Sequence, residues 1–357
     1  MSSILYILLA LLLLGIMVTV HELGHFCAAR ACGIAVQAFA VGFGPKLVSW
    51  KGKKSGTEYS IRLIPCGGFC AFYGEDDTQG KEAKEDPRSM MLQPAWKRLI
   101  TIAAGPLMNF VLAFVVAWCF FLAYGLPYAG DKTTTVIVST QAGSPAAEAG
   151  RAEGDVITAV DGERVNGNLA ELIGAWQGGE PLTLTVQRGE EEMQLSLLPR
   201  YDAQENRYMI GITMNILSDT VWQRAGFGDT LSHTWNVCVS AGSAILDALG
   251  KLVSKGEGVD QMSGPVGVIN IIAEQTREYK LMGYLNMLIM ISINLGLVNL
   301  LPIPGLDGCR ILFVLFEMIF RRPVNRRVEA YIHLAGYVFL MGIMLYFTFH
   351  DVLNIFT

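Results

Sequence analysis

The chain has 357 residues, of which 52% are hydrophobic and only 17% are charged. Ordinary soluble domains contain about 25% charged residues, so this composition favours a membrane protein. The formal net charge is −5 and no segment forms a basic block, which argues against a nucleic-acid partner.

Four apolar segments are candidates for membrane-spanning helices, which need about 20 residues. They are residues 4–20, 99–130, 281–306 and 334–349. The first segment lacks the basic start and cleavage site of a signal peptide, so we expect a retained helix. The connections after the first and third segments are basic, whereas the middle one is mostly acidic. The positive-inside rule therefore places the two basic connections in the cytosol, and the termini and the middle region outside.

The first connection contains strand-like sequence. Residues 58–63 alternate polar and apolar side chains, which predicts a β-strand. Glycine-rich apolar segments, 41–45 and 66–69, flank this strand. In a cytosolic loop such segments indicate a membrane-associated β-hairpin region, or backbone that re-enters the bilayer within the protein.

The middle connection predicts a small folded domain. Strands are expected at 134–139 and 182–187, and short helices at 146–149 and 169–176. Ser144-Pro145-Ala146-Ala147-Glu148-Ala149-Gly150, followed by Gly154-Asp155-Val156-Ile157 and Asp161-Gly162, resembles a PDZ domain of bacterial proteases. After this domain, residues 231–253 predict an amphipathic helix on the outer membrane surface. Ser263 is the expected N-cap of a further helix, with Pro265 in its first turn.

The first apolar segment ends in His21-Glu22-Leu23-Gly24-His25. Histidines four residues apart lie on one face of a helix, so both imidazoles can reach a single zinc ion. Glu22 lies close enough to contact water on that ion without being a ligand. Two histidines and a glutamate at the end of a membrane helix are costly to insert, which argues against a chance match.

A hydrolytic zinc site needs a third protein ligand. Asp307 is the only acidic residue between Lys280 and Glu317, and it follows Pro302 and Pro304, which break the preceding helix. Its alternative role is to cap the helix expected at 309–320. Beside two histidines with ligand spacing, the ligand role is the stronger interpretation.

These motifs, in this order, resemble the bacterial site-2 proteases. Within that family they are most similar to the regulator-of-sigma-factor intramembrane zinc metalloproteases with a single PDZ domain. The resemblance also rests on four shorter motifs: Gly42-Phe43-Gly44-Pro45, Pro65 with Gly67-Gly68, Gly105-Pro106-Leu107-Met108-Asn109 and Ser263-Gly264-Pro265-Val266-Gly267. One departure is Cys309, where the family often has a second glycine after the ligand aspartate; we expect a small packing residue there.

The resemblance implies one catalytic Zn²⁺ ion, with His21, His25 and Asp307 as ligands and Glu22 as the catalytic base. It also implies substrate contacts from Asn299 and from the β region. The predicted substrate-binding residues are Asn299, Gly42, Phe43, Gly44 and Arg62.

We therefore predict a polytopic α-helical membrane protein with four transmembrane helices, a membrane-associated β-hairpin region and an inserted α+β PDZ domain. The predicted divisions are 1–131 (two spans, zinc motif and β region), 132–200 (PDZ-like), 201–280 (extracytoplasmic, amphipathic) and 281–357 (two spans, third ligand). The predicted function is intramembrane cleavage of single-span proteins, such as anti-sigma factors or remnant signal peptides, as a second cut after ectodomain trimming. A membrane zinc transporter or sensor, and an inactive PDZ scaffold, are the alternatives.

The predicted location is a bacterial cell membrane, with the active site towards the cytosolic leaflet and the PDZ-like domain outside. Transmembrane protein substrates and membrane lipid are the expected partners.

Overall fold

The computed structural model describes residues 3–75, 86–141, 143–150, 154–176, 178–189, 191–202, 207–258 and 263–356. The chain forms two compact units: residues 1–123 with 226–357, and residues 124–225.

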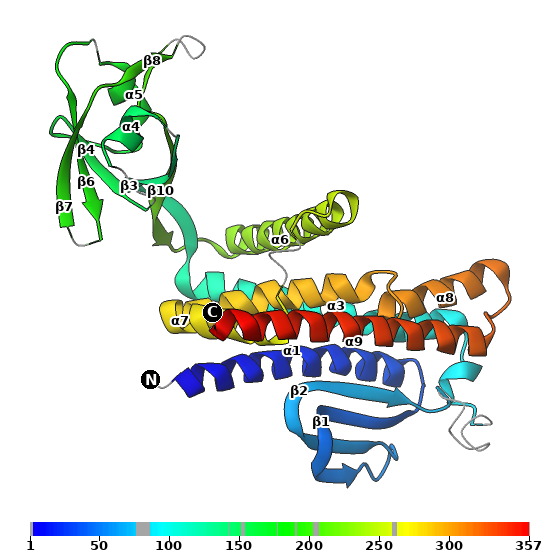
Figure 1. Ribbon diagram of the computed structural model, residues 1–357. Helices are drawn as coiled ribbons and strands as arrows, with labels where there is room; N and C mark the ends of the chain where they lie inside the picture. The colour runs from blue at the N-terminus through cyan, green and yellow to red at the C-terminus, as the bar shows by residue number, and fades with distance from the viewer. Residues whose placement is uncertain are drawn as a thin grey trace. The chain divides into compact units, whose positions relative to one another are not determined.

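The first unit is a helical bundle that carries a small sheet (Figure 1). Its helices are α1 (Ser3–Ala31), η1 (Met90–Leu92), α3 (Ala95–Tyr124), α6 (Phe227–Lys255), α7 (Pro265–Leu300), α8 (Asp307–Phe320) and α9 (Arg326–Phe356). Five helices of the described chain are long and apolar enough to cross a membrane: α1, α3, α6, α7 and α9. The helix predicted at 231–253 is α6, which also meets these criteria of length and composition. The number of spans therefore remains a prediction.

Helix α7 is two helices joined at Lys280, where the backbone is non-helical (φ 53°, ψ −128°). The second of these helices begins where the third apolar segment was predicted, at residue 281, and it ends at Leu300. Ala10, Leu13 and Met17 of α1 form a buried cluster with Ile272 and Leu288 of α7. This packing fixes α7, and hence the loop that follows it, against the helix with the two histidines.

The expected N-cap at Ser263 is wrong. Gly264 is the N-cap of α7 and makes no side-chain cap bond. Instead, the N–H of Gly267 donates to the carboxylate of Asp351 in α9, at 2.8 Å. A Cβ on Gly264 or Gly267 would lie 2.8 or 2.9 Å from the carboxylate of Asp351. The two glycines therefore leave room for Asp351, from another helix, to cap the start of α7 in place of a neighbouring side chain.

The sheet of this unit consists of β1 (Val36–Lys51) and β2 (Glu58–Phe72), paired antiparallel. Both strands fold back on themselves, so that residues 38–41 of β1 pair on one side with 58–61 and on the other with 68–71. Gly42 and Gly44 adopt positive φ values of 88° and 85°, which only glycine reaches without strain. The predicted β-hairpin region is therefore present, and residues 67–72 form one of its outer edges.

The second unit contains an antiparallel sheet with strand order β10-β3-β4-β6-β7, and β5 pairs with β4. Its elements are β3 (Leu126–Thr140), α4 (Pro145–Glu148), β4 (Val156–Val160), β5 (Glu163–Arg164), α5 (Leu169–Gly174), β6 (Leu182–Arg188), β7 (Glu191–Leu197), β8 (Arg200–Asp202), β9 (Arg207–Met209) and β10 (Ile212–Gln223).

The core of the second unit is built from alternate residues of its strands and from α5, including Ile137, Ile157, Leu169 and Leu184. The elements predicted around 134–139, 146–149, 169–176 and 182–187 are all present. The compact unit is wider than the predicted 132–200, because β10 pairs with β3 along its whole length.

Candidate metal centre

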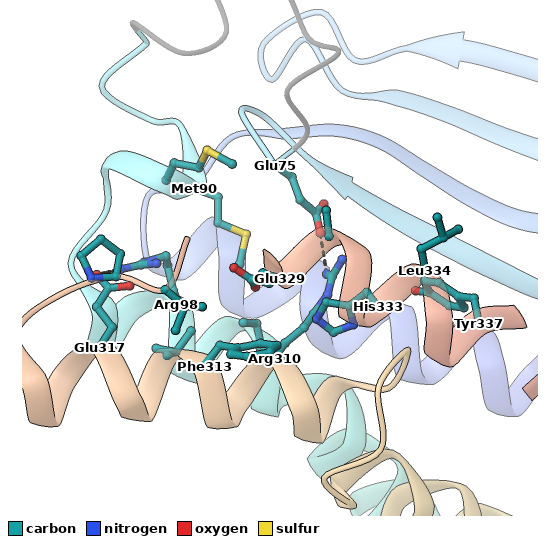
Figure 2. Close-up of a pocket in the computed structure, with 16 residues that line it drawn as sticks. Glu75, Met90, Arg98, Arg310, Phe313, Glu317, Glu329, His333, Leu334 and Tyr337 are labelled. Carbon is teal, nitrogen blue, oxygen red and sulfur yellow. Dashed lines mark hydrogen bonds and ion pairs between the residues drawn. The ribbon is translucent and has the colours of Figure 1, made fainter. Parts of the chain in front are cut away.

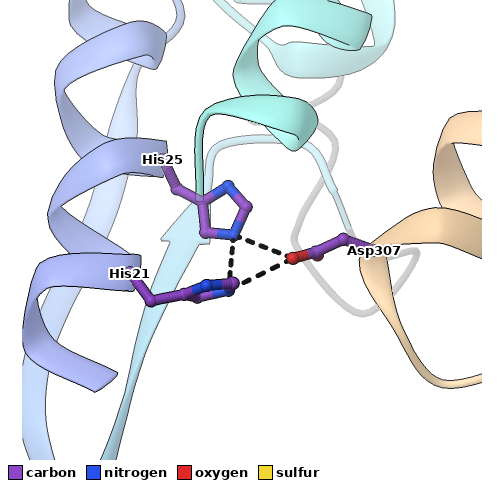
Figure 3. Close-up of side chains that lie close together, drawn as sticks. All are labelled: His21, His25 and Asp307. Atoms are coloured by element: carbon purple, nitrogen blue, oxygen red, sulfur yellow. Dashed lines mark hydrogen bonds and ion pairs between the residues drawn. The ribbon is translucent and has the colours of Figure 1, made fainter. Parts of the chain in front are cut away.

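Helix α1 presents His21 and His25 on one buried face, and α8 presents Asp307 to both (Figure 3). Oδ2 of Asp307 lies 3.1 Å from Nε2 of His21 and 3.3 Å from Nε2 of His25. The two Nε2 atoms are 3.2 Å apart. Ligands placed tetrahedrally about 2.0–2.1 Å from a zinc ion are about 3.3–3.4 Å from one another. The three atoms are therefore spaced like three corners of a zinc tetrahedron.

The hydrogen bonding of His25 shows which kind of group fits between these atoms. Nδ1 of His25 lies 2.9 Å from the backbone carbonyl of Thr101, which can only accept, so Nδ1 carries a proton. In the neutral imidazole Nε2 then presents a lone pair towards the carboxylate of Asp307. Two acceptors this close need a proton or a cation between them, and a zinc ion that contacts all three atoms meets that need. In the described residues, this is the one group of His, Cys, Asp or Glu side chains that could hold a metal.

The loop before α8 aims Asp307 at the histidines. Helix α7 ends at Leu300, and the two prolines keep the chain out of helix until α8 begins at Asp307 itself. The N-cap of α8 is Leu306 and makes no side-chain cap bond, so Asp307 does not serve as the cap. The N–H of Gly305 donates to Nδ1 of His333 in α9, at 3.1 Å, and this bond holds the loop in place.

Helices α1 and α3 cross very closely at the metal centre. A Cβ on Gly24 would lie 2.9 Å from Cβ of Met108 and would also collide with the carbonyl of Ala104. A Cβ on Gly105 would collide with the imidazole of His25. Small residues at such crossings let helix backbones approach one another in a membrane. The glycine of Gly105-Pro106-Leu107-Met108-Asn109 therefore makes room for a metal-facing ring.

Glu22 lies close both to the three metal-facing side chains and to the sheet. The backbone N–H of Cys70 donates a hydrogen bond to its carboxylate. A Cβ on Gly68 would lie 3.5 Å from Cγ of Glu22, so glycine leaves this side of the carboxylate open. The edge of β2 at residues 67–70 thus runs beside the residue predicted to be the base.

The predicted substrate-binding residues lie in separate places. Gly42, Phe43, Gly44 and Arg62 gather at the fold of the sheet, where Nη1 of Arg62 donates to the carbonyl of Gly44 at 3.0 Å. The guanidinium of Arg62 also lies 4.9 Å from the ring centre of Phe69. Asn299 is in the last turn of α7 and is partly buried. No hydrogen bond described in the structure joins these residues to the three metal-facing side chains.

A cavity of about 530 Å³ lies beside the metal centre, between α3, α8, α9 and the end of β2 (Figure 2). Two ion pairs line it: Arg310 with Glu75, and Arg98 with Glu317, each at 2.5 Å. Ile102 also lines the cavity and is adjacent to Thr101, whose carbonyl contacts His25. The cavity is therefore lined by both charged and apolar side chains, and it lies within one helical turn of Asp307 along α8 and beside Thr101 in α3.

The family model for peptidase family M50, the site-2 proteases, matches residues 9–343. The chain belongs to this family. Several relatives match almost end to end. The regulator of sigma-W protease RasP of Bacillus subtilis is 30% identical, over 97% of this chain and 98% of the relative. Metalloprotease MmpA of Caulobacter vibrioides is 29% identical, over 98% and 96%. The zinc metalloprotease RasP of Bacillus licheniformis is 29% identical, over 97% and 98%.

This M50 chain is accordingly a zinc metalloendopeptidase and a multi-pass bacterial membrane protein. The structure brings the three predicted ligands, His21, His25 and Asp307, close together. Sequence reasoning assigned no role to Thr101, Gly105, Asn109, Gly68 or Cys70, although three of them belong to motifs on which the family resemblance rested. Their positions in those motifs were the signal that could have singled them out.

Proposed function

We propose that His21, His25 and Asp307 hold one catalytic zinc ion and that Glu22 is the general base for cutting peptide bonds of transmembrane proteins. The observation that supports this most strongly is the convergence of three ligand atoms within 3.1–3.3 Å, from two helices far apart in sequence. Ionisable side chains in the helical part of a membrane protein cost free energy to bury, so a cluster of them indicates a function.

The zinc ion and the residues around it have separate roles in peptide-bond hydrolysis. Zinc, when bound, supplies a Lewis acid that polarises the scissile carbonyl and makes water acidic enough to attack at neutral pH. Glu22 accepts the proton of that water and returns it to the leaving nitrogen. The backbone N–H of Cys70 faces the carboxylate of Glu22 and helps to orient it. The cavity lined by Arg310 and Arg98 is the proposed route for water from the cytosolic side.

The proposed substrates are single-span membrane proteins, such as anti-sigma factors or remnant signal peptides. A helical substrate hides its carbonyls in hydrogen bonds, so the segment to be cut must first become extended. Extended segments bind readily to the edge of a sheet. The edge of β2 at residues 67–70 borders Glu22, and we place the unwound segment there. In this arrangement Asn299 binds the substrate backbone, whereas Gly42, Phe43, Gly44 and Arg62 support the sheet behind it.

The proposed orientation follows from the charges of the connections. The sheet and the loop after α8 face the cytosol, and the 124–225 unit lies outside. That unit is inserted in the chain between the helix pair α1–α3 and the helices that lead to Asp307. We propose that it is a PDZ domain that excludes substrates with a bulky outer domain, so that cleavage follows an earlier trimming cut.

The test is the substitution Glu22→Gln in the purified full-length protein. It removes the proton acceptor and leaves the three ligands in place, so zinc content stays at one ion per chain while cleavage of a model single-span substrate is lost. The matched control is Glu58→Gln, which makes the same change at a partly exposed glutamate at the start of β2. Near-normal cleavage by the Glu22 variant would overturn the proposed mechanism.

A further inference from the structure

Asn109 of α3 is a fully buried polar residue that directly contacts a metal-facing histidine. Its side chain is 0% exposed, and its amide nitrogen lies 3.2 Å from Nδ1 of His21. Its amide oxygen is also buried and has no hydrogen-bond partner. A buried amide with an unused oxygen is costly, so this residue requires a physical reason.

A metal ion bound to His21 determines whether Nδ1 of His21 pairs with the nitrogen or with the oxygen of the Asn109 amide. When Nε2 of His21 binds a metal, its lone pair is used there, and the ring proton must be on Nδ1. Nδ1 is then a donor and requires an acceptor. The nitrogen of an amide cannot accept, whereas the oxygen can. Rotation of the amide by half a turn exchanges the two atoms at nearly constant shape.

Nothing else in the described structure selects one orientation of this amide. The atom that points away from His21 has no partner in the present orientation, and a half turn would leave the other atom in the same place. Among the described hydrogen bonds, the contact with Nδ1 of His21 is thus the only one that differs between the two orientations of the amide. A metal at Nε2 therefore turns the oxygen of Asn109 towards His21.

The two histidines then have equivalent supports on one helix. Nδ1 of His25 is held by the carbonyl of Thr101, and Nδ1 of His21 by Asn109, two turns further along α3. Gly105 lies between these two positions and leaves space for the imidazole of His25. Ligand histidines commonly donate their second ring N–H to such an acceptor, which fixes both the tautomer and the ring orientation.

We propose that Asn109 is a positioning residue of the metal centre, which accepts a hydrogen bond from Nδ1–H of His21 through its amide oxygen. This inference rests on the proposed zinc ligands. It assigns to the last residue of Gly105-Pro106-Leu107-Met108-Asn109 a role in metal affinity rather than in helix packing.

The test measures zinc affinity of the full-length protein in detergent, by competition with a chromophoric chelator. Asn109→Leu keeps the shape of the side chain and removes the acceptor, so the zinc dissociation constant rises by about 10–100-fold. Asn109→Asp keeps an acceptor and cannot donate, so affinity is retained. Ser292→Ala is the control, because it removes another fully buried side-chain oxygen that lacks a partner. It leaves zinc affinity unchanged.

Two further measurements keep the outcomes distinct. His21→Ala loses zinc in the same assay; if it does not, the proposed ligands are wrong. If His21→Ala loses zinc and Asn109→Leu binds it normally, only the role of Asn109 is wrong. Nitrogen NMR of histidine-labelled, zinc-loaded wild type needs no substitution at position 109. It shows a protonated Nδ1 on His21, and an unprotonated Nδ1 would overturn the inference even if a variant failed to fold.

Discussion

Gly105 offers a sharp test of the metal centre, because one added methyl group there affects a single ring. The Cβ of an alanine at this position would lie within 3.0 Å of three imidazole atoms of His25, whereas ordinary contact begins at 3.4 Å. The ring must move by about 1 Å, and a misplacement of that size can lower a rate by on the order of 100-fold. We therefore expect Gly105→Ala to reduce cleavage by about two orders of magnitude and to weaken zinc binding.

The same substitution is expected to leave the fold intact. Gly105 lies inside α3, where alanine is intrinsically favoured over glycine by about 0.8–1.0 kcal/mol. The assay compares cleavage of a single-span substrate, zinc content and thermal unfolding of the zinc-free protein. Gly342→Ala in α9 is the matched control, since a Cβ there meets nothing within 4 Å. Cleavage by Gly105→Ala within about threefold of wild type would refute the close approach of α3 to His25 and the reasoning built on it.

Three further predictions concern the third ligand, the orientation and the outer unit. Asp307→Ala should lower zinc occupancy and cleavage together, measured by metal analysis of the purified protein; full occupancy would mean that another residue completes the site. Tags at both termini and at Glu191 should be reachable from outside, and a tag near Lys53 only from the cytosol; protection of the Glu191 tag in intact cells would contradict this. Replacing residues 141–211 by a two-residue turn joins ends that already pair in the β3–β10 ribbon. It should increase cleavage of an untrimmed substrate and spare that of a trimmed one, at equal amounts of folded enzyme; loss of trimmed-substrate cleavage would instead indicate a substrate receptor.

The metal-facing residues could be predicted from sequence because their signals are local. Spacing places His21 and His25 on one helix face, and the prolines before Asp307 mark a break in a membrane helix. The same logic predicted the strand from Glu58 and the short helices of the second unit. Each of these depends on periodicity or turn chemistry within a few residues.

What the sequence did not reveal depends on contacts between distant segments. The cap of α7 comes from Asp351, more than 80 residues away, so the local pattern pointed wrongly to Ser263. The roles of Gly105 and Asn109 follow from the crossing of α1 and α3, which no local pattern encodes. The fold of β1 and β2 back on themselves likewise arises from long-range pairing, and it brings Cys70 next to Glu22.

The central claim is that two imidazoles and one carboxylate hold the catalytic zinc. X-ray absorption at the zinc edge of the purified wild-type protein tests it directly, because sulfur ligands lie at about 2.3 Å and nitrogen or oxygen ligands at about 2.0–2.2 Å. We predict one zinc ion per chain with two imidazole nitrogens, oxygen ligands and no sulfur, and a loss of this signal in His21→Ala. A sulfur ligand, such as the buried Cys309, or an unchanged spectrum in His21→Ala, would contradict the account.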